Sequence, residues 1–172
     1  YGESNMRGAY RSIGINRNDF MSLIQINDNR PDDIKAIQWL SFASNAFNVM
    51  VPFYADIETT PDYLSNTTGE VSTDNFYWSS RMIAAMADAS YKKSIFHIER
   101  YQEHVLSKGH EIINRYDDMI QNEADTDKHL ALKHEANQAV ADMPKAATSD
   151  TLGKVLYELS NEMKNAYSRS DA

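Results

Sequence analysis

The chain has 172 residues, with 17 Lys and Arg against 25 Asp and Glu, so its formal net charge is −8. This charge argues against nucleic acid as a partner, because phosphate binding needs clustered cations. No apolar run approaches the ~20 residues that cross a bilayer, and the N-terminus lacks the basic and apolar regions of a secretory signal. We therefore expect a cytoplasmic protein with no membrane partner.

The chain contains no cysteine, which removes disulfides, thiolate metal sites and thiol nucleophiles from these residues. A hydrophobic content of 42% is enough for the core of one domain of roughly 100–200 residues. The first residue is Tyr1 rather than Met, and composition leaves open whether the chain is a processed product or part of something longer.

The first third of the chain has the pattern of β-strands. Short alternating or β-branched apolar runs predict four antiparallel strands, at residues 12–16, 20–26, 34–42 and 49–54. Asn18 and Asp19 predict a hairpin turn between the first two strands, and the polar residues 27–33 predict a loop. Pro52 cannot donate a ladder hydrogen bond, so the fourth strand is expected at an edge or with a bulge.

The rest of the chain has the pattern of helices. An acidic connection, with one helical turn at residues 62–64, leads to a helix capped by Thr73 or Asp74. A second helix capped by Ser94 keeps its apolar spacing across Gly109. A third helix is predicted at 126–141, ending before Pro144, and a final helix carries an apolar stripe from residue 152 to 163.

This order predicts an α+β fold, with antiparallel strands followed by about four helices. We expect residues 1–57 to form the sheet portion, residues 58–74 the acidic connection, and residues 75–172 a helical portion that packs with the sheet as one domain fragment.

No motif predicts a metal or cofactor. The five histidines lie in the helical half, and neither of the helical metal motifs Glu-x-x-His and His-Glu-x-x-His occurs. The glycines form no phosphate-binding loop, and no serine lies in a Gly-x-Ser-x-Gly motif. We expect no cofactor and no metal.

Four polar residues of the strand half are candidate binding groups. Asn16 and Arg17 end the first predicted strand, and Asn45 and Asn48 lie in the connection between the last two. Loops on a rigid sheet commonly carry binding groups. Turn chemistry explains the asparagines equally well, because Asn tolerates the left-handed conformation.

Several blocks of the strand half resemble a known family. These are YRSIGINR at residues 10–17, LIQI at 23–26, IQWL at 37–40 and NAFNVMVPFYA at 45–55. Their order and spacing over about residues 1–65 resemble the bacterial dipeptidases of the C69 peptidase family, which are related to the secernins.

The resemblance implies an αββα N-terminal nucleophile hydrolase, in which an N-terminal cysteine attacks the peptide carbonyl and its α-amine serves as base. A chain without cysteine is then a C-terminal fragment, inactive alone, whose partners are a small peptide substrate and the remaining N-terminal portion of the same enzyme. The resemblance implies that Asn16 and Arg17 bind substrate, and that Arg17 contacts a substrate carboxylate. It also implies that Asn45 or Asn48 donates an amide N–H near the reacting carbonyl.

A second hypothesis is a non-catalytic helical interaction module with a small sheet. A sheet with an open edge or face favours the dipeptidase portion, whereas a closed core without a pocket near Arg17 favours the module. The sequence leaves open whether the chain forms a homo-oligomer.

Overall fold

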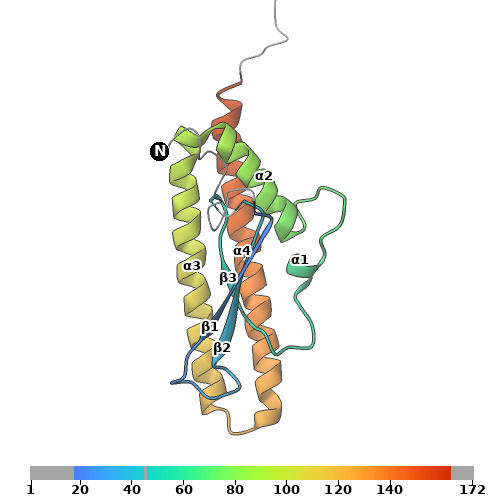
Figure 1. Ribbon diagram of the computed structural model, residues 1–172, viewed down its shortest axis with the longest axis vertical. Helices are drawn as coiled ribbons and strands as arrows, with labels where there is room; N and C mark the ends of the chain where they lie inside the picture. Colours follow the sequence, from blue (N-terminus) through green and yellow to red (C-terminus); the bar gives the residue numbers. More distant parts are fainter. Residues whose placement is uncertain (1–17, 45, 164–172) are drawn as a thin grey trace, which may run out of the picture.

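The computed structural model describes residues 18–44 and 46–163, with strands first and helices second (Figure 1). This order confirms the predicted α+β class. The strands are β1 (Phe20–Ile26), β2 (Ala36–Phe42) and β3 (Val51–Tyr54), and the helices are α1 (Asp62–Ser65), α2 (Phe76–Ala89), α3 (Tyr91–Asn122) and α4 (His129–Ser160), with a 3₁₀ turn, η2 (Thr126–Lys128), before α4.

The described strands form one antiparallel sheet in the order β1-β2-β3. Phe20 pairs with Phe42 across the first ladder, and Leu40 pairs with Val51 across the second. β3 is an edge of this sheet, as Pro52 predicts. The expected strand at residues 12–16, and its hairpin with β1, lie outside the described residues.

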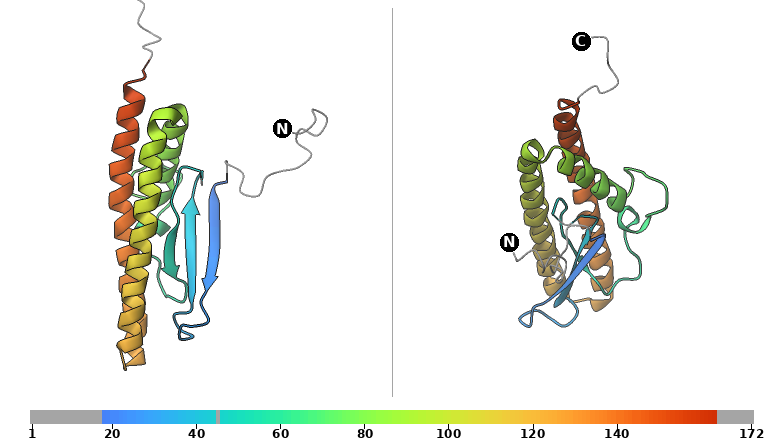
Figure 2. Two further views of the ribbon diagram at one scale, coloured as in Figure 1. Left: turned by 90° about the vertical axis from the view of Figure 1, so that its left-hand side faces the viewer. Right: turned by 45° about the horizontal axis from the view of Figure 1, so that its top comes forward.

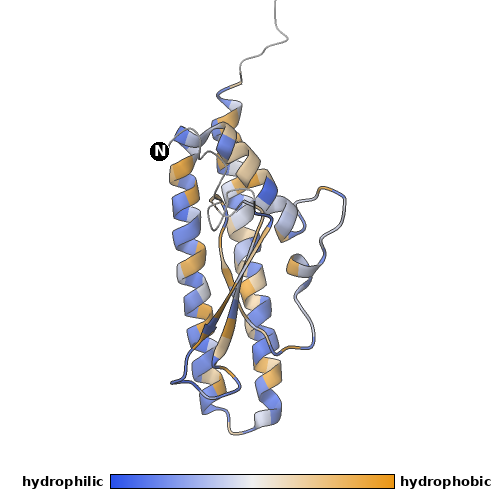
Figure 3. Cartoon of the chain, viewed as in Figure 1, coloured by the Kyte–Doolittle hydropathy of each residue, from blue (hydrophilic) through white to orange (hydrophobic). Residues whose placement is uncertain are grey.

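The long helices α3 and α4 run antiparallel beside each other, with α2 against their upper half (Figure 1). Bands of hydrophobic and hydrophilic residues alternate along both long helices (Figure 3). The buried apolar positions of α3 recur every three or four residues on either side of Gly109, so the helix continues across this glycine, as predicted.

Two predicted helix boundaries are wrong in the second half of the chain. The predicted helices at 126–141 and 152–163 are one helix, α4, which passes through Pro144. An interior proline costs ~3 kcal/mol or more, but α4 is packed on both sides of it. Val140 lies before the proline and Val155 beyond it, and both are fully buried. Burial along the whole helix therefore overrides the local break.

The predicted helix caps are also wrong by a few residues. Asn75, rather than Thr73 or Asp74, caps α2, and its side chain accepts a hydrogen bond of 2.9 Å from the backbone N–H of Trp78. α3 begins at Tyr91, so Ser94 lies inside the helix, where its hydroxyl is buried 2.5 Å from that of Ser90.

Gly109 allows β3 to lie close to α3. A Cβ atom at this position would lie 2.9 Å from Cδ of Pro52, closer than carbon atoms normally approach. The glycine is therefore explained by a close helix–strand approach.

The free edge of β3 is completed by a side chain of α4. The buried Asn137 accepts a hydrogen bond from the backbone N–H of Tyr54 (3.0 Å) and donates one to the Tyr54 carbonyl (2.9 Å). One amide side chain thus does what a neighbouring strand would do, and satisfies two backbone groups that burial would otherwise leave without partners.

The Tyr54 side chain fastens the same strand to α3. Its hydroxyl donates a 2.6 Å hydrogen bond to Asp117, whose other carboxylate oxygen lies 2.6 Å from the guanidinium of Arg30 in the β1–β2 loop. Burial raises the pKa of the Tyr54 hydroxyl far above its usual range and raises the pKa of Asp117, while Arg30 opposes the second effect. This network joins the loop, the sheet and α3.

The sheet extends away from the helices, with β3 nearest to them and β1 farthest (Figure 2). β1 therefore has little cover on either face. Four of its large apolar side chains are more than half exposed: Phe20, Leu23, Ile24 and Ile26. Among the described residues, no strand pairs with the outer edge of β1.

Over the described residues, no helix has both the length and the apolar character needed to cross a membrane.

We expect Asn137→Ala to lower the free energy of unfolding by about 2–5 kcal/mol, because both backbone groups of Tyr54 lose their partner inside the core. Urea denaturation measures this change. Gln138→Ala is the matched control, since that side chain is exposed and bonds only Asp142 on the same helix, and it should cost less than about 0.5 kcal/mol. Equal losses for the two variants would contradict the role of Asn137.

Candidate functional site

Asn48 is the one sequence-predicted site residue that the described part of the chain includes. Asn16, Arg17 and Asn45 lie outside the described residues. Asn48 lies in the loop between β2 and β3 and is only 4% exposed.

The Asn48 side chain closes its own loop. Its Nδ2 donates a 2.7 Å hydrogen bond to the carbonyl of Phe42, and its backbone carbonyl accepts one of 3.0 Å from Gln102 on α3. Only the amide nitrogen can donate to a carbonyl, so the orientation of the side chain is set. The Oδ1 atom is buried and has no hydrogen-bond partner among the described residues.

The start of β1 and the end of β2 meet at this end of the sheet. The backbone N–H of Ala43 donates a 2.9 Å hydrogen bond to the carbonyl of Asp19. Ala43 has a φ of 61°, in the left-handed region that non-glycine residues seldom occupy. The chain therefore leaves β2 by a sharp turn, and the described neighbours of Arg17 and Asn45 lie beside each other.

A hollow of about 260 Å³ lies between this turn and α2. The loop contributes Ala43, Ser44 and Phe47, and α2 contributes one face of the helix. That face consists of residues at i, i+3, i+4 and i+7, which are Arg81, Ala84, Ala85 and Asp88. The hollow thus has small apolar residues in its middle and opposite charges on the helix at its two ends.

Arg81 is held at one side of the hollow. Its Nη1 atom forms an ion pair with Asp19 and lies 3.4 Å from the hydroxyl of Tyr77, whose ring centroid is 5.8 Å from the guanidinium carbon. No hydrogen bond from Nε or Nη2 reaches an acceptor in the described residues. The side of the guanidinium that binds carboxylates in a bidentate manner is therefore available.

Arg81 and Asp88 were not among the candidates that the sequence supplied. Their spacing, seven residues apart with Ala84 and Ala85 between them, places them on one helical face. The sequence pattern cannot show what that face lies against, because the facing loop comes from a segment about 40 residues earlier.

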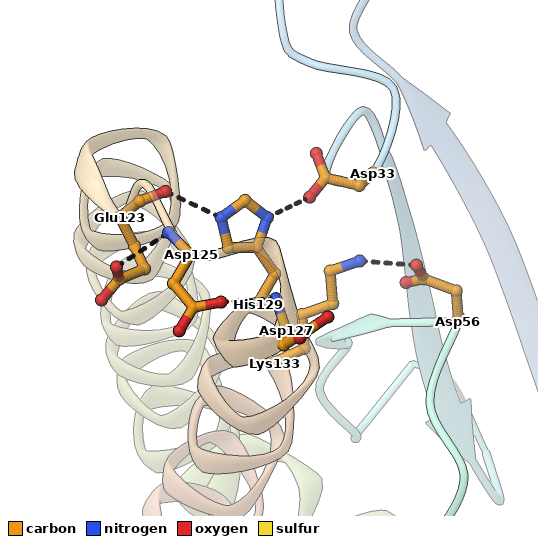
Figure 4. A network of polar contacts seen from close by, with 7 residues as sticks. All are labelled: Asp33, Asp56, Glu123, Asp125, Asp127, His129 and Lys133. Atoms are coloured by element: carbon orange, nitrogen blue, oxygen red, sulfur yellow. Dashed lines mark hydrogen bonds and ion pairs between the residues drawn. The ribbon is translucent and has the colours of Figure 1, made fainter.

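A second polar cluster lies at the opposite end of the sheet (Figure 4). His129, the first residue of α4, contacts two acceptors: its Nδ1 lies 2.7 Å from Asp33 in the β1–β2 loop, and its Nε2 lies 3.0 Å from the carbonyl of Glu123 after α3. Nearby, Lys133 donates a 2.6 Å hydrogen bond to Asp56 after β3.

Two acceptors for two ring nitrogens favour the charged imidazolium, since the neutral ring has only one N–H. The carbonyl of Glu123 and the carboxylate of Asp33 accordingly raise the pKa of His129, while burial and, less strongly, Lys133 oppose them. The cluster joins three connecting segments of the chain, so we interpret it as structural. Within the described ranges, no three His, Cys, Asp or Glu side chains are arranged to hold a metal ion.

Sequence comparisons agree with the resemblance noted above. The model of peptidase family C69 matches residues 1–104. The chain is 39% identical over 163 residues to a probable dipeptidase A of Streptococcus pyogenes serotype M3, covering 95% of this chain and 34% of that protein. It is 35% identical over 207 residues to a dipeptidase of Bifidobacterium longum, covering 99% of this chain and 39% of that one.

A more distant relative is dipeptidase A of Lactobacillus helveticus, which is 30% identical over 160 residues. The chain therefore belongs to peptidase family C69, and it spans about a third of the length of the curated relatives that it matches.

We expect the contribution of His129 to stability to fall as the pH rises. Its pKa is raised above 6.5 in the folded protein, so the stabilisation is complete below that value and is lost as the pH rises through the folded pKa. The difference in free energy of unfolding between the wild type and His129→Gln, measured by urea denaturation, should shrink from about pH 6 to about pH 9.

His134→Gln is the control, because among the described residues the His134 ring has a single hydrogen-bond contact, with the Thr59 hydroxyl at 3.5 Å. If the difference in free energy of unfolding between the wild type and His129→Gln stayed constant with pH, His129 would not be held as an imidazolium between Asp33 and Glu123.

Proposed function

We propose that this chain forms part of a cysteine dipeptidase, an N-terminal nucleophile hydrolase that cleaves the amide bond of dipeptides in the cytoplasm. The nucleophilic cysteine lies in polypeptide outside these 172 residues. Membership of peptidase family C69 and relatives named dipeptidase support the substrate class. The absence of cysteine, and matches to about a third of each relative, support a divided site.

The exposed strand β1 carries the proposal furthest. Its apolar side chains are exposed on both faces, and its outer edge has no partner among the described residues. Exposed apolar strands of this kind are sites of association. We assign this surface to the rest of the same enzyme, whose second sheet would complete an αββα sandwich. A covered β1 would instead have fitted a self-contained interaction module.

In the proposed reaction, the cysteine thiolate attacks the peptide carbonyl, and the α-amine of the same residue takes up the thiol proton. An α-amine with a pKa near 7.7–8.0 can accept a proton at neutral pH. The amine then returns the proton to the leaving amino group, and water hydrolyses the thioester.

This chain supplies binding groups to that site. Asn16 and Arg17 would contact the substrate, and Arg17 would bind the substrate carboxylate. Asn45 or Asn48 would donate an N–H to the developing oxyanion. For Asn48, one amide hydrogen is already bonded to Phe42, so its second hydrogen would be the donor.

Alkylation should abolish dipeptide hydrolysis by the full-length enzyme, and a chelator should leave it intact. Iodoacetamide removes the nucleophile, whereas no step of the proposed reaction uses a metal. Release of amino acids from a dipeptide panel measures both effects. Residues 1–172 alone should release none above a buffer control. Metal-dependent, alkylation-resistant hydrolysis would reject the mechanism.

Replacing Arg17 with Ala in the full-length enzyme should lower kcat/KM by roughly one to two orders of magnitude, because a charge-assisted hydrogen bond is worth about 1.5–3 kcal/mol. Arg17→Lys should recover little of the loss, since an ammonium lacks the planar fork. Steady-state kinetics and thermal unfolding are measured together. Unchanged kcat/KM with unchanged stability would remove Arg17 from the site.

A further inference from the structure

We propose that the hollow between the β2–β3 loop and α2 binds the two charged ends of the dipeptide substrate, with Arg81 joining Arg17 in binding the carboxylate and Asp88 binding the α-ammonium. This assignment rests on the proposed dipeptidase function and extends it to the residues that bind the two ends of the substrate.

The first support is the chemistry of the two charged side chains, Arg81 and Asp88. Arg81 uses only Nη1 for its contacts with Asp19 and Tyr77, which fix the guanidinium and leave the Nε and Nη2 side open. That side matches a carboxylate with two parallel hydrogen bonds. Asp88 has no ion pair or hydrogen bond to any other described residue, so its carboxylate is free to accept an ammonium group.

The second support is the spacing. Seven residues of α-helix rise ~10.5 Å, which is the axial separation of the Cα atoms of Arg81 and Asp88. An extended dipeptide spans ~7 Å and needs roughly 12 Å with a charge-assisted hydrogen bond of ~2.8 Å at each end. A tripeptide would need roughly 16 Å. The spacing of the two backbone positions is therefore on the scale of a dipeptide.

The third support is the shape of the hollow and the backbone beside it. Its volume of about 260 Å³ lies just below the ~300–1,000 Å³ of drug-sized ligand pockets, which suits a small ligand. Ala84 and Ala85 leave room over the helix between the two charges. Ala43, which lines the other side, has a left-handed backbone, and such strained conformations are concentrated at functional sites.

The experiment compares three forms of one substrate in the full-length enzyme. A dipeptide that the wild type cleaves is chosen from a panel, and kcat/KM is measured for it, for its C-terminal amide and for its N-acetyl form. Arg81→Gln should lower kcat/KM for the free dipeptide by roughly ten- to a hundredfold and leave the amide unchanged. Asp88→Asn should lower kcat/KM for the free dipeptide and leave the N-acetyl form unchanged.

Matched controls separate binding from folding. Arg100→Gln and Asp118→Asn remove the same charges from α3, and should lower kcat/KM for all three substrates by less than about twofold. Asp19→Asn breaks the ion pair of Arg81 but leaves Arg81 and Asp88 themselves unchanged. If Arg81 only holds β1 in place, Asp19→Asn will reproduce the Arg81→Gln loss, and the loss will be equal for the dipeptide and its amide.

Each outcome of these measurements bears on the assignment. End-specific losses in both variants support the assignment. Losses that are equal for all three substrates, or absent, overturn it, as does an end-specific loss for Arg17→Ala without one for Arg81→Gln. If Arg81→Gln fails to fold, Asp88→Asn still decides, since Asp88 has no hydrogen bond or ion pair to lose within the described part of the chain. A wild type that cleaves no dipeptide of the panel overturns the proposed function itself.

Discussion

The structure depends on how the edge strand β3 is held by helices. Asn137 of α4 pairs with both backbone groups of Tyr54, and the Tyr54 hydroxyl bonds Asp117 of α3. The sheet is thereby attached to the helix pair through its edge, and Gly109 gives Pro52 the room to approach α3. Because the attachment is made at β3, the other strands extend outward, and β1 ends up farthest from the helices (Figure 2).

This attachment explains two features that matter for function. β1 is left with apolar side chains in solvent, which is a surface that further polypeptide can cover. At one end of the sheet, the turn at Ala43 lies against α2 and forms the hollow with Arg81 and Asp88. At the other end, His129 joins the loop and the helix connection. One end of the sheet therefore carries a hollow, whereas hydrogen bonds of His129 close the other end.

The three described strands and the order of elements could be predicted from the sequence, because alternation and turn residues are local signals and Pro52 excludes a central strand. Helix boundaries could not be predicted as well. The break expected at Pro144 is overridden by packing against residues far away in the chain, and Ser94 bonds Ser90 inside α3 instead of capping it. Asn48 was found as a polar loop residue, but the partner of its amide, Phe42, required the structure. Arg81 was missed because its surroundings come from another segment.

Hydroxyl-radical footprinting of the full-length enzyme tests most directly whether polypeptide outside these residues completes the sheet. In this structure Ile24 of β1 is 67% exposed and Tyr157 of α4 is 65% exposed, so the two form a matched pair of sites after correction for their intrinsic reactivities. The account predicts that β1, including Ile24, is protected in the full-length enzyme, while Tyr157 is labelled at the rate its exposure implies. Equally efficient labelling of both residues would contradict the account, because β1 would then be a free surface and the chain would not be one part of a larger sandwich.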